Sequence, residues 1–128
     1  MRFLIVEDSR PTRNLIKNYL SEIDIGREVS FIEAENGETA LAVLSQNHVD
    51  FIILDWNLSS KMTGLDILKT IRKLEKYKTI PTIMVTSESG KHNVIEALKC
   101  GANDFTVKPI DRKAFSEKVL KHAMGILF

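Results

Sequence analysis

The sequence predicts an α/β fold: one doubly wound sheet of five parallel strands, with five helices packed on its two faces in a three-layer sandwich. Two observations on the 128 residues lead to this fold class. Short apolar runs alternate five times with longer segments whose apolar residues recur at helical spacing. The run at 51–54 is apolar without interruption, which is typical of a strand buried on both faces of a parallel sheet. Strands that alternate with helices in this way pair in parallel through right-handed crossovers.

The first half of the chain is expected to hold two strands and two helices. The first helix follows Ser9, a good capping residue, and has Pro11 in its first turn. The run Asp-Ile-Gly at 24–26 should stop it. In order, the elements are a strand at 2–6, the helix after Ser9, a strand at 29–34 and a helix opened by Asn36-Gly37.

The second half continues the alternation. Gly101 is expected to close a helix, because glycine adopts the left-handed conformation common at helix ends. Asp111 should cap the last helix. In order, the elements are a strand at 50–54, a loop at 55–64, a helix marked by apolar residues at 65–74, a strand from 81 to 86, a helix at about 91–99, a strand at 104–107 and the helix after Asp111.

Composition restricts the function classes. The net charge of +1 argues against a strong attraction to nucleic acid or acidic membranes. The single cysteine, Cys100, allows no internal disulfide, and no apolar run is long enough to span a membrane. We therefore expect a cytoplasmic protein without membrane insertion, formed by one domain over residues 1–128 and no second domain. We also expect it to be a monomer.

Polar side chains stand at the carboxyl ends of four predicted strands: Glu7-Asp8, Asp55, Thr86 and Lys108. These ends share one edge of a parallel sheet, where ligands of such folds bind. Crowded carboxylates repel one another, and Mg²⁺, which prefers oxygen ligands, removes that repulsion. A lysine and a hydroxyl suit a phosphoryl group. The pattern predicts a site for Mg²⁺ and a phosphoryl group, with a carboxylate as nucleophile.

Each of these residues also has an ordinary explanation. A carboxylate or amide after a strand commonly caps a helix or forms a turn, which applies to Glu7, Asp8, Asp55 and Asn57. Thr86 could be an ordinary strand residue, because threonine is common in strands. Lys108 could be a solvated surface residue, as most lysines are. The functional interpretation depends on the occurrence of all of them at corresponding strand ends.

The chain resembles the receiver domains of two-component response regulators, and among them most closely the CheY-like chemotaxis receivers. The resemblance covers essentially the whole chain and implies the flavodoxin-like arrangement of the sheet. It rests on the order and spacing of six segments: Glu7-Asp8-Ser9, Asp55-Trp56-Asn57-Leu58, Gly64-Leu65-Asp66, Met84-Val85-Thr86-Ser87-Glu88, Cys100-Gly101-Ala102 and Val107-Lys108-Pro109.

The resemblance implies a role for each strand-end residue. Asp55 would be the phosphoacceptor and, with Asp8, a Mg²⁺ ligand. The backbone carbonyl of Asn57 would be a further ligand, and Glu7 would assist through water. Thr86 would hydrogen-bond the phosphoryl group and, with Phe105, form the switch. Lys108 would pair with the phosphoryl group, and the peptide bond between Lys108 and Pro109 would be cis.

The resemblance also implies partners. A histidine kinase would supply the phosphoryl group, and the changed surface of the fourth helix, fifth strand and fifth helix would bind a target, such as the flagellar motor switch. A phosphatase is a possible further partner. The chain would then catalyse only its own phosphorylation and dephosphorylation. Two alternatives are a stand-alone phosphorelay receiver and a Mg²⁺-dependent phosphohydrolase of the haloacid dehalogenase type. That second class has an Asp-x-Asp pair, whereas Asn57 follows Asp55 here.

The sequence departs from the family pattern at several positions. Glu7 stands where many receivers have aspartate, and Phe105 where CheY-like proteins typically have tyrosine. The loop at 58–64 lacks the usual proline and is about one residue longer. Lysines are frequent in the last third, where they form either a solvated helix face or a docking surface for an acidic partner. They are Lys91, Lys99, Lys108, Lys113, Lys118 and Lys121.

Overall fold

The structure, a computed structural model, describes residues 1–58, 61–87 and 91–127, and it confirms the predicted fold class. Parallel strands form one sheet in the order β2-β1-β3-β4-β5. The strands are β1 (Arg2–Val6), β2 (Ser30–Ala34), β3 (Phe51–Asp55), β4 (Thr82–Thr86) and β5 (Asp104–Val107). The helices are α1 (Arg10–Ser21), α2 (Gly37–Gln46), α3 (Gly64–Lys73), α4 (Lys91–Lys99) and α5 (Arg112–Leu127).

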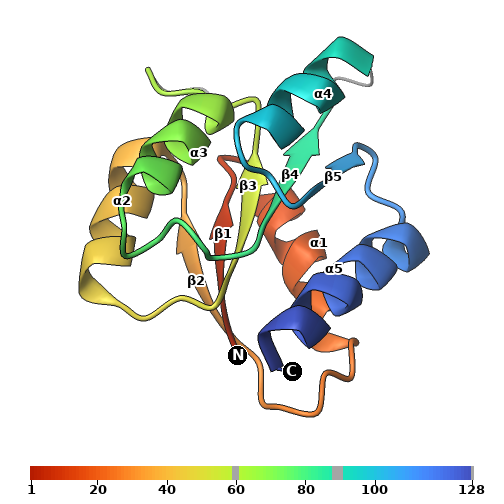
Figure 1. Ribbon diagram of the computed structural model, residues 1–128. Helices are drawn as coiled ribbons and strands as arrows, with labels where there is room; N and C mark the ends of the chain where they lie inside the picture. Colours follow the sequence, from red (N-terminus) through yellow and green to blue (C-terminus); the bar gives the residue numbers. More distant parts are fainter. Residues whose placement is uncertain (59–60, 88–90, 128) are drawn as a thin grey trace.

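Helices cover both faces of the sheet, so the fold is doubly wound (Figure 1). On one face, α1 and α5 bury Ile16, Leu20 and Phe115 against alternate strand residues. On the other face, α2, α3 and α4 form a second core with the remaining strand residues, in which Leu44 and Ile67 are buried. Both cores contain residues of β3, because this central strand is buried along its whole length.

The expected helix caps are present. The side chains of Ser9, Asn36 and Asp111 accept hydrogen bonds from backbone N–H groups three residues ahead. These bonds satisfy donors that a helix N-terminus leaves without partners. Gly101, after α4, has the expected positive φ of 105°.

Several boundaries differ from the expectation, among them the start of β2, which is Ser30 and not residue 29. Helix α1 ends at Ser21 and not at residues 24–26. Strand β3 begins at Phe51 and includes Asp55, which pairs with Val85, because the ladder continues to a bond from Trp56 N to the Val85 carbonyl. Strand β4 begins one residue after Pro81.

Some expectations cannot be compared with the structure. Ser59 and Ser60 of the longer loop, and Glu88 of the segment after Thr86, lie outside the described residues. Within the described ranges, no helix combines the length and apolar character that crossing a membrane requires.

Candidate functional site

The carboxyl ends of four parallel strands bring the predicted site residues to one edge of the sheet. Asp55 is the last residue of β3 and only 2% exposed. Glu7 follows β1 directly and is also buried, and Thr86 is the buried last residue of β4. Lys108 follows β5, and its backbone N–H donates to the Thr86 carbonyl at 2.8 Å. The geometry therefore joins residues that lie far apart in the sequence.

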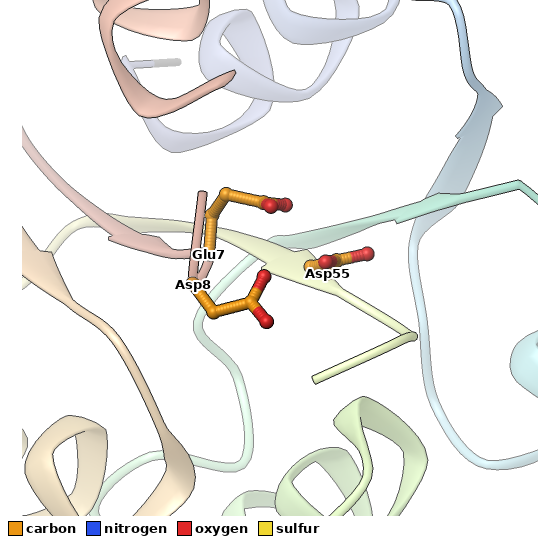
Figure 2. Close-up of side chains that lie close together, drawn as sticks. All are labelled: Glu7, Asp8 and Asp55. Carbon is orange, nitrogen blue, oxygen red and sulfur yellow. The ribbon is translucent and has the colours of Figure 1, made fainter. Parts of the chain in front are cut away.

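Three carboxylates converge at this edge. Glu7, Asp8 and Asp55 each offer an oxygen atom, and these atoms lie within 4.8 Å of one another. Figure 2 shows the three side chains close together at the ends of β1 and β3. Glu7 and Asp55 are buried, whereas Asp8 is exposed. Hard divalent cations take carboxylate oxygens as ligands and keep some of their water. The residues present fit such a cation, because the buried Glu7 and Asp55 carboxylates offer oxygen ligands and the exposed Asp8 leaves room for water.

The Lys108 ammonium is the positive charge that pairs with the two buried carboxylates. Its Nζ atom lies 3.2 Å from Glu7 Oε2 and 3.3 Å from Asp55 Oδ2. Burial alone would lower the pKa of Lys108, but the carboxylates of Asp55 and Glu7 outweigh it and raise that pKa. The ammonium group is thus charged and placed beside Asp55, where an added anionic group would meet it.

The crowding also acts on Glu7. Burial and the neighbouring Asp55 carboxylate raise the pKa of Glu7 from 4.5 to about 7, against the opposing effect of Lys108. Near neutral pH the metal-free site thus holds a proton on Glu7 for part of the time. A bound cation would displace that proton, because it replaces the charge that the proton supplies.

The loop after Asp55 is anchored to the strand that precedes it. Asn57 N–H donates to Asp55 Oδ1 at 3.2 Å, and Gly64 N–H donates to the Trp56 carbonyl at 2.9 Å. Thr63 and Asp66 form a reciprocal capping box at the start of α3. These contacts fix the backbone on both sides of the loop and so hold the Asp55 side chain in place.

The Asn57 side chain has a partner that the sequence did not indicate. Ser87 Oγ, after β4, donates to Asn57 Oδ1 at 3.2 Å. The bond joins the segments that follow β3 and β4. A serine after a strand is too common to predict such a contact.

Phe105 lies on β5, the strand that Lys108 follows, but its ring packs against a hydrophobic core. Its half-buried ring packs against the core that α2, α3 and α4 cover. On α5, the Lys118 ammonium lies 4.8 Å from the ring centroid and donates to the Phe105 carbonyl. Lys118 therefore contacts both the ring and the backbone of this residue. The peptide bond between Lys108 and Pro109 is cis, as expected.

Comparison with known families decides what kind of domain this is. The model of the response regulator receiver domain matches residues 3–120. The chain belongs to the response regulator receiver domain family. It is a receiver domain of the CheY type, a signalling domain; receiver domains typically need a divalent metal, and this chain has a cluster of three carboxylates at one edge of its sheet.

Individual relatives agree with this assignment. Chemotaxis protein CheY of Pseudomonas aeruginosa is 38% identical over 121 residues, which cover 94% of this receiver domain and 94% of the relative. Chemotaxis protein CheY1 of Helicobacter pylori is 42% identical over 120 residues, covering 93% and 94%. Among solved structures, the Mn²⁺-bound form of response regulator Rcp1 has a TM-score of 0.76 at 26% identity, covering 98% of this chain and 90% of that one.

Proposed function

We propose that this receiver domain is a phosphorylation-activated switch in which Asp55 accepts a phosphoryl group from the phosphohistidine of a histidine kinase. One observation carries the proposal: the buried Asp55 carboxylate ends the central strand, in contact with the Lys108 ammonium and beside two further carboxylates. An Asp55 oxygen attacks phosphorus in line, the bond between phosphorus and the histidine nitrogen breaks, and an acyl phosphate forms.

Asp8 and Asp55 are the proposed carboxylate ligands of a Mg²⁺ ion, with the Asn57 backbone carbonyl as a further ligand and Glu7 assisting through water. The bound ion would neutralise charge on the transferring phosphoryl group. The oxygen donors within 4.8 Å support this proposal, and so does the Mn²⁺-bound form of the related Rcp1.

Lys108 and Thr86 are the proposed partners of the phosphoryl group. Lys108 Nζ already contacts Asp55 Oδ2, so it can follow the oxygens of a group attached there. Such a contact between opposite charges is strongest in a site that excludes water, and Asp55 is nearly fully buried. Thr86 would donate its hydroxyl to the phosphoryl group from the end of the neighbouring strand.

The proposed output is a change at α4, β5 and α5. Movement of Thr86 toward the phosphoryl group would let the Phe105 ring turn inward, and phosphorylation would bias this two-state equilibrium. The relatives are named as chemotaxis proteins, and the target that we propose is the flagellar motor switch, with a phosphatase as a further partner. Hydrolysis of the acyl phosphate would reset the switch.

The experiment that tests the function uses acetyl phosphate as a small donor. With Mg²⁺ present, we expect the intact mass to increase by one phosphoryl group, and with a chelator we expect no increase. The modification should decay on its own in solution, because acyl phosphates hydrolyse. No modification with Mg²⁺ at any donor concentration would refute the proposed acceptor chemistry.

Magnesium affinity should depend on pH through Glu7. Because folding raises the pKa of Glu7 from 4.5 to about 7, the metal-free folded protein keeps its proton more tightly than the unfolded chain does. Its stability should therefore fall as the pH rises through this window. Apparent Mg²⁺ affinity should rise over the same window and level off above pH 7. Mg²⁺ titrations at several pH values, followed by Trp56 fluorescence, measure this affinity.

The matched variant for this prediction is Glu7→Gln, which has no titratable group at position 7. Its Mg²⁺ affinity should be nearly independent of pH between 5 and 8, values that bracket the shifted pKa of Glu7. An unchanged pH profile in this variant would show that another group controls the dependence.

Phe105 should affect output and not chemistry. Phe105→Ala is expected to leave the phosphorylation rate within about twofold of the parent, because the ring packs against the core that α2, α3 and α4 cover and against Lys118. It should weaken the gain in target binding on activation by up to about 2 kcal/mol, the value of burying such a ring. Phe105→Tyr keeps the ring and should retain most of the gain. Phosphorylation rate and target affinity, measured in parallel, separate the two effects; an unchanged activation ratio in Phe105→Ala would make the ring ordinary core packing.

A further inference from the structure

Arg13 is a buried arginine on α1 that the proposed chemistry does not use. Its side chain is only 8% exposed, and it lies three and seven residues before Ile16 and Leu20, which are buried on the inner face of the helix. An arginine this deeply buried requires partners, because a charge without them is costly to remove from water. The partners of its guanidinium lie in the segment after β1, in β2 and directly after β2.

One of these partners is the backbone of the acidic site. Arg13 Nη1 donates to the Glu7 carbonyl at 2.7 Å in a buried hydrogen bond. That carbonyl belongs to the peptide group that joins Glu7 to Asp8. The Glu7 N–H donates to the Ala34 carbonyl of β2 at 3.0 Å, so the backbone is held on both sides of Glu7. The bond from Arg13 thus fixes the orientation of the peptide plane from which Asp8 projects.

The charge of Arg13 is balanced away from the site. Its Nε lies 3.0 Å from Glu33 Oε1, and its Nη2 lies 3.7 Å from Glu35 Oε1. The two glutamates are its ionic partners. At the acidic edge Arg13 contacts an uncharged group, the Glu7 carbonyl. Lys108 differs in this respect, because its ammonium pairs directly with the Glu7 and Asp55 carboxylates.

We propose that Arg13 is a positioning residue for the cation site: it holds the Glu7–Asp8 peptide group so that the two carboxylates converge with Asp55. The inference rests on the proposed function in one respect, that Asp8 and Asp55 bind a divalent cation and Glu7 assists through water. Groups that orient metal ligands without touching the metal typically contribute 10–100-fold to metal affinity.

The test measures Mg²⁺ binding directly, through the fluorescence of Trp56, the only tryptophan in the chain. Arg13→Met removes the hydrogen bond and keeps a long side chain, and we expect its folded form to bind Mg²⁺ at least about tenfold more weakly than the parent. At saturating Mg²⁺, phosphorylation from acetyl phosphate should recover to within a few-fold of the parent. Urea unfolding with a chelator gives the folded fraction, so that lost stability is not counted as lost affinity.

Lys17→Met is the matched control. Lys17 Nζ also pairs with Glu33, at 3.2 Å, and lies on the same helix. We expect this variant to bind Mg²⁺ within twofold of the parent. Equal losses in Lys17→Met and Arg13→Met would attribute the effect to the charge balance around Glu33 and overturn the proposal.

If Arg13→Met does not fold, Arg13→Lys provides the test. The guanidinium reaches Glu33, Glu35 and the Glu7 carbonyl through three different nitrogen atoms. A single ammonium that pairs with the Glu33 and Glu35 carboxylates cannot also reproduce the hydrogen bond to the Glu7 carbonyl. We expect weaker Mg²⁺ binding in this variant too, and parent-like affinity in a folded Arg13 variant would overturn the proposal. If the parent itself gives no Mg²⁺ response, the proposed site fails together with the inference. If the parent responds and the folded Arg13 variants respond equally, only the inference fails.

Discussion

Asp55→Asn is expected to form no acyl phosphate with acetyl phosphate and Mg²⁺ under conditions in which the parent is fully modified. The amide is not a nucleophile toward phosphorus, so the loss should be complete and not partial. The variant should remain folded, because its side-chain oxygen can still accept the bond from Asn57 N–H. Burial is the largest cause of the raised pKa of Glu7, and loss of the Asp55 charge removes a further cause, the repulsion between the two carboxylates. We therefore expect metal-free stability at least equal to that of the parent near neutral pH.

The control for this variant is Asp50→Asn. Asp50 immediately precedes β3, at the opposite end of the strand from Asp55, and its carboxylate accepts a bond from Arg2 N–H. Its replacement should leave phosphorylation unchanged. Intact-mass spectrometry of both variants provides the measurement, and full modification of Asp55→Asn would exclude Asp55 as the acceptor.

Gly64→Ala is expected to destabilise the fold and the site together. A Cβ atom at Gly64 would lie 2.0 Å from the Asp55 carbonyl oxygen and 2.7 Å from Trp56 Cα. These are backbone atoms, so no side-chain rotation can relieve the overlap, and the end of β3 must move. We expect a loss of about 3 kcal/mol in the free energy of unfolding, at the upper end of typical overpacking. Phosphorylation should slow as well, because the displaced backbone carries Asp55.

Gly125→Ala is the matched control for Gly64→Ala. Gly125 lies in α5, and a Cβ there would meet no atom within 4 Å. Alanine favours a helix over glycine by up to about 1 kcal/mol, so this variant should be as stable as the parent or slightly more stable. Urea unfolding compares the two variants. Equal stability of Gly64→Ala and the parent would mean that the contact between α3 and β3 adapts to a methyl group.

The fold could be predicted because its local signals agree with one another. Strand β3 is an uninterrupted apolar run, and the caps Ser9 and Asn36 precede apolar residues at helical spacing. The end of α1 was predicted less well. Ile23 and Ile25 continue to contact the core after the helix has ended, so apolar spacing alone placed the end too late.

The site could be predicted as far as the sheet dictates it. A parallel sheet brings its carboxyl ends to one edge, which is why the sequence brought Asp55 and Lys108 together. The distances between these side chains could not be predicted, and neither could the pKa shifts and hydrogen bonds that depend on those distances. Neither the raised pKa of Glu7 nor the contact of Arg13 with its carbonyl follows from a residue type. Arg13 recurs at helical spacing with the apolar residues of α1, which was a signal that it is buried. A charged residue at such a position is more often solvated, so the signal was weak.

The measurement that tests the central claim most directly is chemical mapping of the phosphoryl group. The protein is treated with acetyl phosphate and Mg²⁺, and borohydride then reduces the acyl phosphate to an alcohol, converting a phosphorylated aspartate to homoserine. Peptide mass spectrometry locates the converted residue. The account predicts homoserine at position 55 and at no other aspartate, with none formed when Mg²⁺ is chelated. Conversion at Asp8 or at any aspartate other than Asp55, with Asp55 unmodified, would contradict it.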